Sequence, residues 1–151
     1  MKTEGNYNNN IGLPLTILRL KDEEVMILEM GMNHLNEMEE LSRIACPDIS
    51  AITNVGTAHI GELGSRENIL KAKLEIVAGM SDGSTLVING DNDMLSTVRF
   101  DNFKVVKVGV DCAAVFKAEK VILMDDHSEF TINYNGKVYQ VVVPVPGIIL
   151  F

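Results

Sequence analysis

The fold class follows from Ile49-Ser50-Ala51-Ile52-Thr53-Asn54-Val55-Gly56-Thr57-Ala58-His59, a short apolar run that ends in a polar loop. The run Ile49 to Thr53 predicts a strand. A helix is predicted to open at Ser65 and to continue to about Met80, and a third strand is predicted over Thr85 to Ile88. Strands that alternate with helices are typical of a parallel sheet covered by helices.

The residues before this stretch extend the alternation. Val25 to Leu28 is apolar without a polar alternate, which predicts a strand buried on both faces. Asn36 is placed to cap a helix that Pro47 stops. Met1 to Thr16 is rich in asparagine and glycine, and we expect a loop there.

The residues after this stretch change in character. A short helix is predicted over Asp91 to Arg99, with Asp91 as its cap, and a fourth strand over Val105 to Val110. Asn135-Gly136 is a strong hairpin signal between β-rich runs. We therefore expect one α/β domain over 1–151, with a mostly parallel sheet in 1–111 and an antiparallel β appendage in 112–147.

The composition limits the partners and the compartment. The chain has 151 residues and a net charge of −8, from 13 Lys and Arg against 21 Asp and Glu. Nucleic acid and anionic membranes attract basic surfaces, so neither is expected as a partner. Cys46 and Cys112 form no spaced motif, and no apolar run approaches the ~20 residues that span a bilayer. A soluble cytoplasmic protein is expected.

Three polar residues are candidates for chemistry. Glu29 ends the first predicted strand, and His59 lies in the loop after the second. On a helical wheel, Lys73 falls inside the apolar stripe of its helix, where desolvation disfavours its ammonium form. Each also has an ordinary structural interpretation: a capping or surface carboxylate, a hydrogen-bonded loop imidazole, and a lysine that snorkels from a helix edge. Together they suggest a site for a hard cation such as Mg²⁺.

Other motifs are weaker or missing. The run Asn89 to Asp93 resembles part of a calcium loop but lacks its downstream glutamate. The printed sequence has no G-x-x-x-x-G-K-[ST] phosphate loop and no G-x-S-x-G nucleophile elbow. The residues alone therefore lead to an α/β domain with a candidate cation site.

Several ordered motifs resemble those of a known family. They are Thr3 to Thr16 (TEGNYNNNIGLPLT), Glu29 to His34 (EMGMNH), Ile52 to His59 (ITNVGTAH), Gly64-Ser65 and Ala72-Lys73. In this order and at these separations they resemble the central domain of the Mur ligase family. The resemblance extends to Pro146-Gly147 and implies a fold like that of the P-loop nucleoside triphosphatases, here without the P-loop itself.

The resemblance implies an activity and a set of site residues. It is closest to members that use ATP and Mg²⁺ to add D-alanyl-D-alanine to a UDP-N-acetylmuramoyl tripeptide, through an acyl phosphate, in peptidoglycan precursor synthesis. By the family's motifs, Glu29 and His59 match Mg²⁺ ligands. Lys73 matches a lysine that is carbamylated and supports a second Mg²⁺. Asn6, Asn8 and Asn9 match a region on the side of the muramyl substrate.

The departures from the family pattern define the alternatives. The family's phosphate loop precedes Thr3, and its His-Asn motif follows Pro146-Gly147; the printed sequence shows neither, so the ATP-binding residues stay unknown. We expect this polypeptide to be inactive as a ligase by itself, and to self-associate through an exposed sheet edge. The alternatives are a related amide ligase of the folylpolyglutamate or cyanophycin synthetase type, and a non-catalytic remnant that binds a nucleotide.

Overall fold

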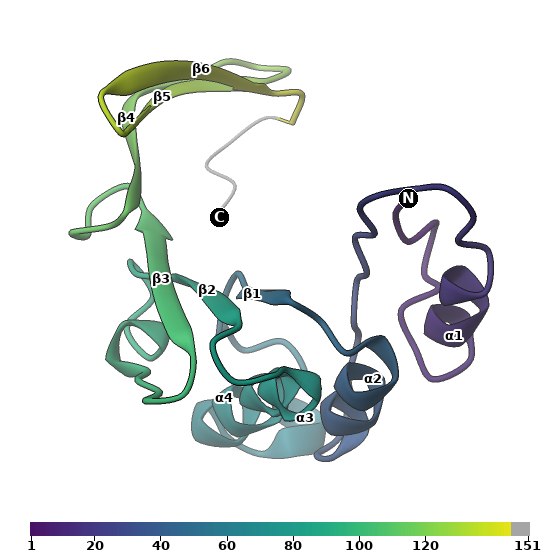
Figure 1. The fold of residues 1–151 in the computed structure, drawn as a ribbon. Coiled ribbons are helices and arrows are strands. Elements are labelled where there is room, and N and C mark those ends of the chain that lie inside the picture. Colours follow the sequence, from purple (N-terminus) through teal and green to yellow (C-terminus); the bar gives the residue numbers. More distant parts are fainter. Residues whose placement is uncertain (146–151) are drawn as a thin grey trace. The chain divides into compact units, whose positions relative to one another are not determined.

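The computed structural model describes residues 1–145 and contains four α-helices, two short 3₁₀ helices and six strands in that range (Figure 1). The helical elements are α1 (Gly12–Ile17), α2 (Glu37–Ala45), α3 (Ile60–Leu63), α4 (Arg66–Leu74), η1 (Glu75–Gly79) and η2 (Leu95–Thr97). The strands are β1 (Ile49–Ile52), β2 (Thr85–Asn89), β3 (Lys104–Gly109), β4 (Phe116–Leu123), β5 (Ser128–Tyr134) and β6 (Lys137–Val143). Among these residues, no helix combines the length and the apolar character that crossing a bilayer requires.

The six strands form one mixed sheet in the order β1-β2-β3-β4-β5-β6. β2 pairs with β3 in parallel, and β3 pairs with β4 in parallel through Val108↔Phe116 and Gly109↔Lys117. β4, β5 and β6 are antiparallel neighbours, and Figure 1 shows them side by side. The predicted fold class is confirmed, and the antiparallel strands prove to be continuous with the parallel ones.

The β5–β6 hairpin turns where the sequence predicts it. Asn135 and Gly136 have φ values of 52° and 75°, which are the left-handed values that a type I′ turn needs at both central positions. The register runs from Tyr134↔Lys137 to Ser128↔Val143 without a shift.

The chain divides into two compact units. The first unit comprises 1–50 and 55–84, and the second comprises 51–54 and 85–151, of which the last six residues lie outside the described range. The core of the first unit includes Leu13, Leu41, Val55, Ile69 and Ala72, and that of the second includes Leu86, Ile88, Leu95, Val106 and Phe130.

The helix predicted from Ser65 to Met80 is confirmed at its start and changes type before its end. The Ser65 side chain accepts a hydrogen bond from the Asn68 N–H at 3.2 Å and caps α4. After Leu74 the chain continues as the 3₁₀ helix η1. The buried Ser42 hydroxyl of α2 donates to the Ile76 carbonyl and accepts from the Gly79 N–H, so α2 engages backbone groups of η1.

The strand predicted over Val25 to Leu28 is wrong. Only Ile27 makes a bridge, in parallel with Lys2, and Val25 and Ile27 are 66% and 67% exposed. The ladder consists of Thr3 N–H to Ile27 carbonyl at 3.0 Å and Ile27 N–H to Met1 carbonyl at 2.9 Å. The segment lies outside the six-stranded sheet, so the apolar run is not covered on two faces.

Three local predictions also need correction. The helix predicted over Asp91 to Arg99 is only the single turn η2, and Asn92 caps it by accepting from the N–H groups of Met94 and Leu95. Asp91 instead accepts from loop N–H groups, including that of Val110 at 2.6 Å. The side chain of Asn36 makes no capping bond, because this residue is left-handed, with φ 73°. Part of the expected N-terminal loop is the helix α1.

Candidate functional site

A pocket of about 560 Å³ lies within the first unit and gathers most of the predicted site residues. Glu29, His59, Lys73, Asn8 and Asn9 all line it, whereas Asn6 does not. The remaining lining residues are Asn10, Met30, Gly31, Met32, Asn33, Glu37, Met38, Glu40 and Leu41. Residues more than 60 positions apart in sequence therefore meet at one concave surface, as is usual for ligand sites.

Glu29 is held in the pocket wall by the N-terminal segment. Its N–H donates to the Thr3 hydroxyl oxygen at 2.9 Å rather than to a strand partner. Its carboxylate accepts a hydrogen bond at Oε1 from Asn8 Nδ2 at 3.0 Å. Glu29 thus reaches the predicted site although the strand predicted before it is absent.

His59 stands at a sharp turn of the backbone. Its φ of 63° is left-handed, a conformation in which histidine is enriched among non-glycine residues. Its carbonyl accepts from the N–H groups of Glu62 and Leu63, which starts the short helix α3. The side chain is exposed and makes no hydrogen bond to any residue in 1–145, so the imidazole is available to a ligand.

Lys73 is half-buried beside the core of the first unit. On α4 it follows the fully buried Ala72, and Ile69 is 1% exposed one turn earlier. Burial lowers the pKa of the Lys73 ammonium, because the charged form loses hydration. No carboxylate in the described chain pairs with it. This is the half-buried position that the helical wheel predicts, and the lowered pKa raises the neutral fraction of the amine at a given pH.

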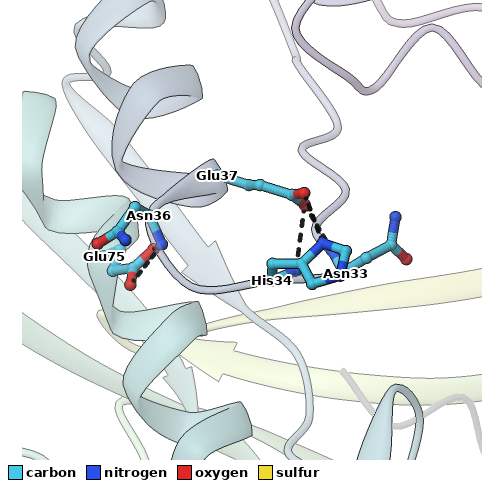
Figure 2. A network of polar contacts seen from close by, with 5 residues as sticks. All are labelled: Asn33, His34, Asn36, Glu37 and Glu75. Atoms are coloured by element: carbon cyan, nitrogen blue, oxygen red, sulfur yellow. Dashed lines mark hydrogen bonds and ion pairs between the residues drawn. The ribbon is translucent and has the colours of Figure 1, made fainter. Parts of the chain in front are cut away.

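The loop before α2 is fixed by two carboxylates that the sequence analysis missed (Figure 2). Glu37 Oε2 accepts from the N–H groups of Asn33 and His34 at 2.7 and 3.2 Å, and its Oε1 lies 2.9 Å from His34 Nδ1. Glu75 accepts the Asn36 N–H at both oxygens. Two hydrogen bonds hold the pKa of the Glu37 carboxyl below its usual value: the bond from the Asn33 N–H has the larger effect, and the bond with the His34 ring the smaller. Glu37 therefore lines the pocket as a carboxylate whose two oxygens already have hydrogen-bond partners.

The asparagines at positions 8, 9 and 10 make different contacts. Asn9 Oδ1 accepts from the N–H groups of Ile11 and Gly12 at 3.1 and 2.8 Å and so begins α1. Asn8 reaches Glu29. Asn10 also lines the pocket, and the sequence analysis did not select it, although its place in the same run was the available signal.

The donor set suits a hard cation that is shared with a ligand. In the described part of the chain, no three His, Cys, Asp or Glu side chains are close enough to hold a metal by themselves. Glu29 and His59 provide one carboxylate and one imidazole in the pocket. Mg²⁺ is commonly held by one or two carboxylates together with water and phosphate oxygens, so the residues present fit Mg²⁺.

Comparison with known proteins finds a matching family model and similar sequences. The family model for the Mur ligase middle domain matches residues 1–149. The UDP-N-acetylmuramoyl-tripeptide–D-alanyl-D-alanine ligase of Bacillus subtilis is 50% identical over 95 residues, which cover 62% of this chain and 21% of the relative.

Solved structures show the same similarity in three dimensions. MurF from Acinetobacter baumannii superposes with a TM-score of 0.88 at 28% identity and covers 97% of this chain and 32% of that one. MurF ligase from Thermotoga maritima, in complex with ADP, superposes with a TM-score of 0.81 at 27% identity over 94% of this chain and 33% of that one. The chain thus spans between a fifth and a third of the length of these proteins.

Proposed function

This chain belongs to the Mur ligase family, whose middle domain it matches. We propose that it is part of an ATP-dependent ligase that joins D-alanyl-D-alanine to a UDP-N-acetylmuramoyl tripeptide. The relative from Bacillus subtilis is named for this reaction. The observation that carries the proposal is the pocket in which Glu29, His59 and Lys73 meet. In the proposed reaction, ATP phosphorylates the terminal carboxylate of the peptide, and the dipeptide amine then displaces phosphate to form the amide.

The three residues have distinct roles in this proposal. Glu29 and His59 hold Mg²⁺, and Lys73 becomes a carbamate that supports a second Mg²⁺. When bound, the cations neutralise charge that builds up between phosphate and carboxylate oxygens. Carbamylation needs the neutral amine: Lys73 Nζ forms a bond to the carbon of CO₂ and releases one proton to solvent. The lowered pKa of Lys73 supports this step, since it raises the neutral fraction.

The asparagine loop is proposed to face the muramyl substrate. Asn8 and Asn9 line the pocket, and each keeps one polar side-chain atom free: Oδ1 of Asn8 and Nδ2 of Asn9. These atoms can accept from and donate to polar groups of a sugar or peptide. Asn6 is proposed as a substrate residue on the family motif alone, since it lies outside the pocket lining.

The remaining proposals concern the wider setting. ATP use is supported by the ADP that the Thermotoga maritima relative binds. A cytoplasmic location is part of the proposal. The acidic net charge of −8 supports action on small molecules rather than on nucleic acid or a membrane. Strand β1 is at one edge of the described sheet, and we propose that it permits self-association.

The carbamate is tested by ¹³C NMR after incubation with ¹³C-bicarbonate at mildly alkaline pH. The wild-type chain and Lys71→Arg, an exposed lysine on the same helix, should both show the carbamate carbon, and Lys73→Arg should lose it. A signal that persists in Lys73→Arg, or none in the wild type, would contradict the role of Lys73.

The cation site is tested by calorimetric titration of Mg²⁺, alone and with ATP. Binding to the wild-type chain should weaken at least tenfold in Glu29→Ala and in His59→Ala. Lys117→Ala, an exposed change in the second unit, serves as the control and should bind like the wild type. Equal affinity in all four proteins would rule out Glu29 and His59 as ligands.

A further inference from the structure

We propose that Asn8 is a positioning residue for Glu29, whose carboxylate it orients toward a cation in the pocket. This inference rests on the proposed function and deepens it. Asn8 Nδ2 donates to Glu29 Oε1 at 3.0 Å, while Oε2 accepts no hydrogen bond from the described residues. One oxygen is therefore occupied by a neutral donor and the other stays available in a pocket that both residues line.

Two further hydrogen bonds tie together the segments that carry the pair. The Gly31 N–H donates to the Asn8 carbonyl at 2.8 Å, and the Glu29 N–H donates to the Thr3 hydroxyl at 2.9 Å. Each bond involves one residue of the carboxamide–carboxylate contact: Asn8 accepts at its carbonyl, and Glu29 donates from its N–H. They hold Asn8 and Glu29 opposite one another although 21 positions separate them in sequence.

Gly31 leaves the space that the Asn8 side chain fills. A Cβ built at Gly31 would lie 3.0 Å from both Cγ and Nδ2 of Asn8, which is closer than most real Cβ contacts. A larger residue at position 31 would therefore crowd the carboxamide of Asn8 out of this place. The hydrogen bond from this carboxamide limits the orientations of the Glu29 carboxylate that accepts it.

The chemistry of an amide suits this task. An exposed glutamate has several side-chain torsions, and freezing them on cation binding costs conformational entropy. A hydrogen bond from a neutral carboxamide removes part of that freedom beforehand and adds no charge that competes for the cation. Partners of this kind change metal affinity by about 10- to 100-fold when they are removed. The His59 side chain has no such hydrogen-bond partner among residues 1–145. Positioning by a carboxamide therefore concerns Glu29 and not His59.

A first experiment tests the contact without any metal. In ¹⁵N NMR spectra of the metal-free 151-residue chain, Asn8→Ala identifies the Asn8 side-chain amide signals. Glu29→Ala should shift these signals clearly more than those of Asn10, which lies in the same loop but makes no hydrogen bond to Glu29. Equal shifts at Asn8 and Asn10 would overturn the proposal.

A second experiment tests the effect on a cation, with Mn²⁺ as the probe and electron paramagnetic resonance as the readout. Asn8→Ala should weaken Mn²⁺ binding about tenfold, whereas Asn133→Ala, an exposed asparagine of β5, should not. In a Glu29→Ala background, Asn8→Ala should cause no further loss, because a positioning residue acts through the group it positions.

The outcomes separate the two proposals. Losses of equal size in both backgrounds would mean that Asn8 acts independently of Glu29, and this would overturn the inference while leaving the cation site intact. No Mn²⁺ binding by the wild-type chain would overturn the proposed cation site and the cation part of this inference. The amide shifts would then still decide whether Asn8 holds Glu29.

Discussion

Two buried serines show how strongly a single hydroxyl depends on its partners. Ser42 is fully buried, and its hydroxyl both donates to the Ile76 carbonyl and accepts from the Gly79 N–H. Ser50 is 4% exposed, and its Oγ has no partner in the described residues. An unpaired buried polar group costs about 1–3 kcal/mol of stability. The same residue type therefore has opposite consequences at these two positions.

We predict that Ser50→Ala stabilises the chain and that Ser42→Ala destabilises it, each by about 1 kcal/mol. For a chain of this size, such a change shifts the melting temperature by about 2–4 °C. Circular dichroism during heating provides the measurement. Shifts in the same direction for both variants would contradict the assignment of their hydroxyl partners.

Lys73 carries a pH-dependent cost for the fold. Its pKa is lower in the folded chain than in the unfolded chain, because burial removes hydration from the ammonium. Between the folded and the unfolded pKa, the unfolded state binds more protons than the folded state, so the free energy of unfolding rises with pH in this range. At pH values below the folded pKa, the full cost of burying the ammonium remains. We predict that Lys73→Met is more stable than the wild type at pH 7 and that this gain shrinks toward pH 10. Lys71→Met, an exposed change on the same helix, should show no such trend in urea unfolding.

At the scale of elements, the contact between α2 and η1 determines where Lys73 and Glu75 lie. The close approach depends on Gly79, because a Cβ there would lie 1.9 Å from the Ser42 carbonyl oxygen. A clash with backbone cannot be relieved by a side-chain rotation. The 3₁₀ helix η1 follows α4 directly, so a shift of η1 would also move the end of the helix that carries Lys73.

We predict that Gly79→Ala lowers the free energy of unfolding by about 3 kcal/mol. Gly61→Ala is the matched control, because a Cβ at Gly61 meets nothing within 4 Å, and alanine favours helix α3. Urea unfolding of both variants gives the comparison. A Gly79→Ala variant as stable as Gly61→Ala would show that α2 and η1 are not in this close contact.

At the scale of the whole molecule, the exposed edge of the sheet bears on association. β1 is the terminal strand of the described sheet, and its Ile49 is 66% exposed. If two chains pair through this edge, a charge at Ile49 should oppose the pairing. We predict a concentration-dependent sedimentation coefficient for the wild type and a concentration-independent one for Ile49→Lys. The same behaviour in both chains would exclude β1 as the interface.

Local patterns predicted those features that depend on local interactions. Ser65 capped α4, Asn135-Gly136 formed the hairpin turn, and the strand–helix order led to the mixed sheet, because turn and cap chemistry acts within a few residues. The same reasoning failed for Val25 to Leu28, since an apolar run becomes a buried strand only when neighbours cover it. Glu29 still lines the pocket, through contacts to Thr3 and Asn8.

By itself, the sequence determined the fold class, the family and the choice of Glu29, His59 and Lys73 as site candidates. Only the tertiary structure decided that Asn8 holds Glu29, that Glu37 closes the Asn33–His34 loop, and that η1 replaces the end of a helix. Periodicity and capping report on neighbours along the chain. Hydrogen bonds between residues 21 or 34 positions apart, as from Asn8 to Glu29 and from Ser42 to Ile76, depend on how the segments pack, and no local pattern encodes that packing.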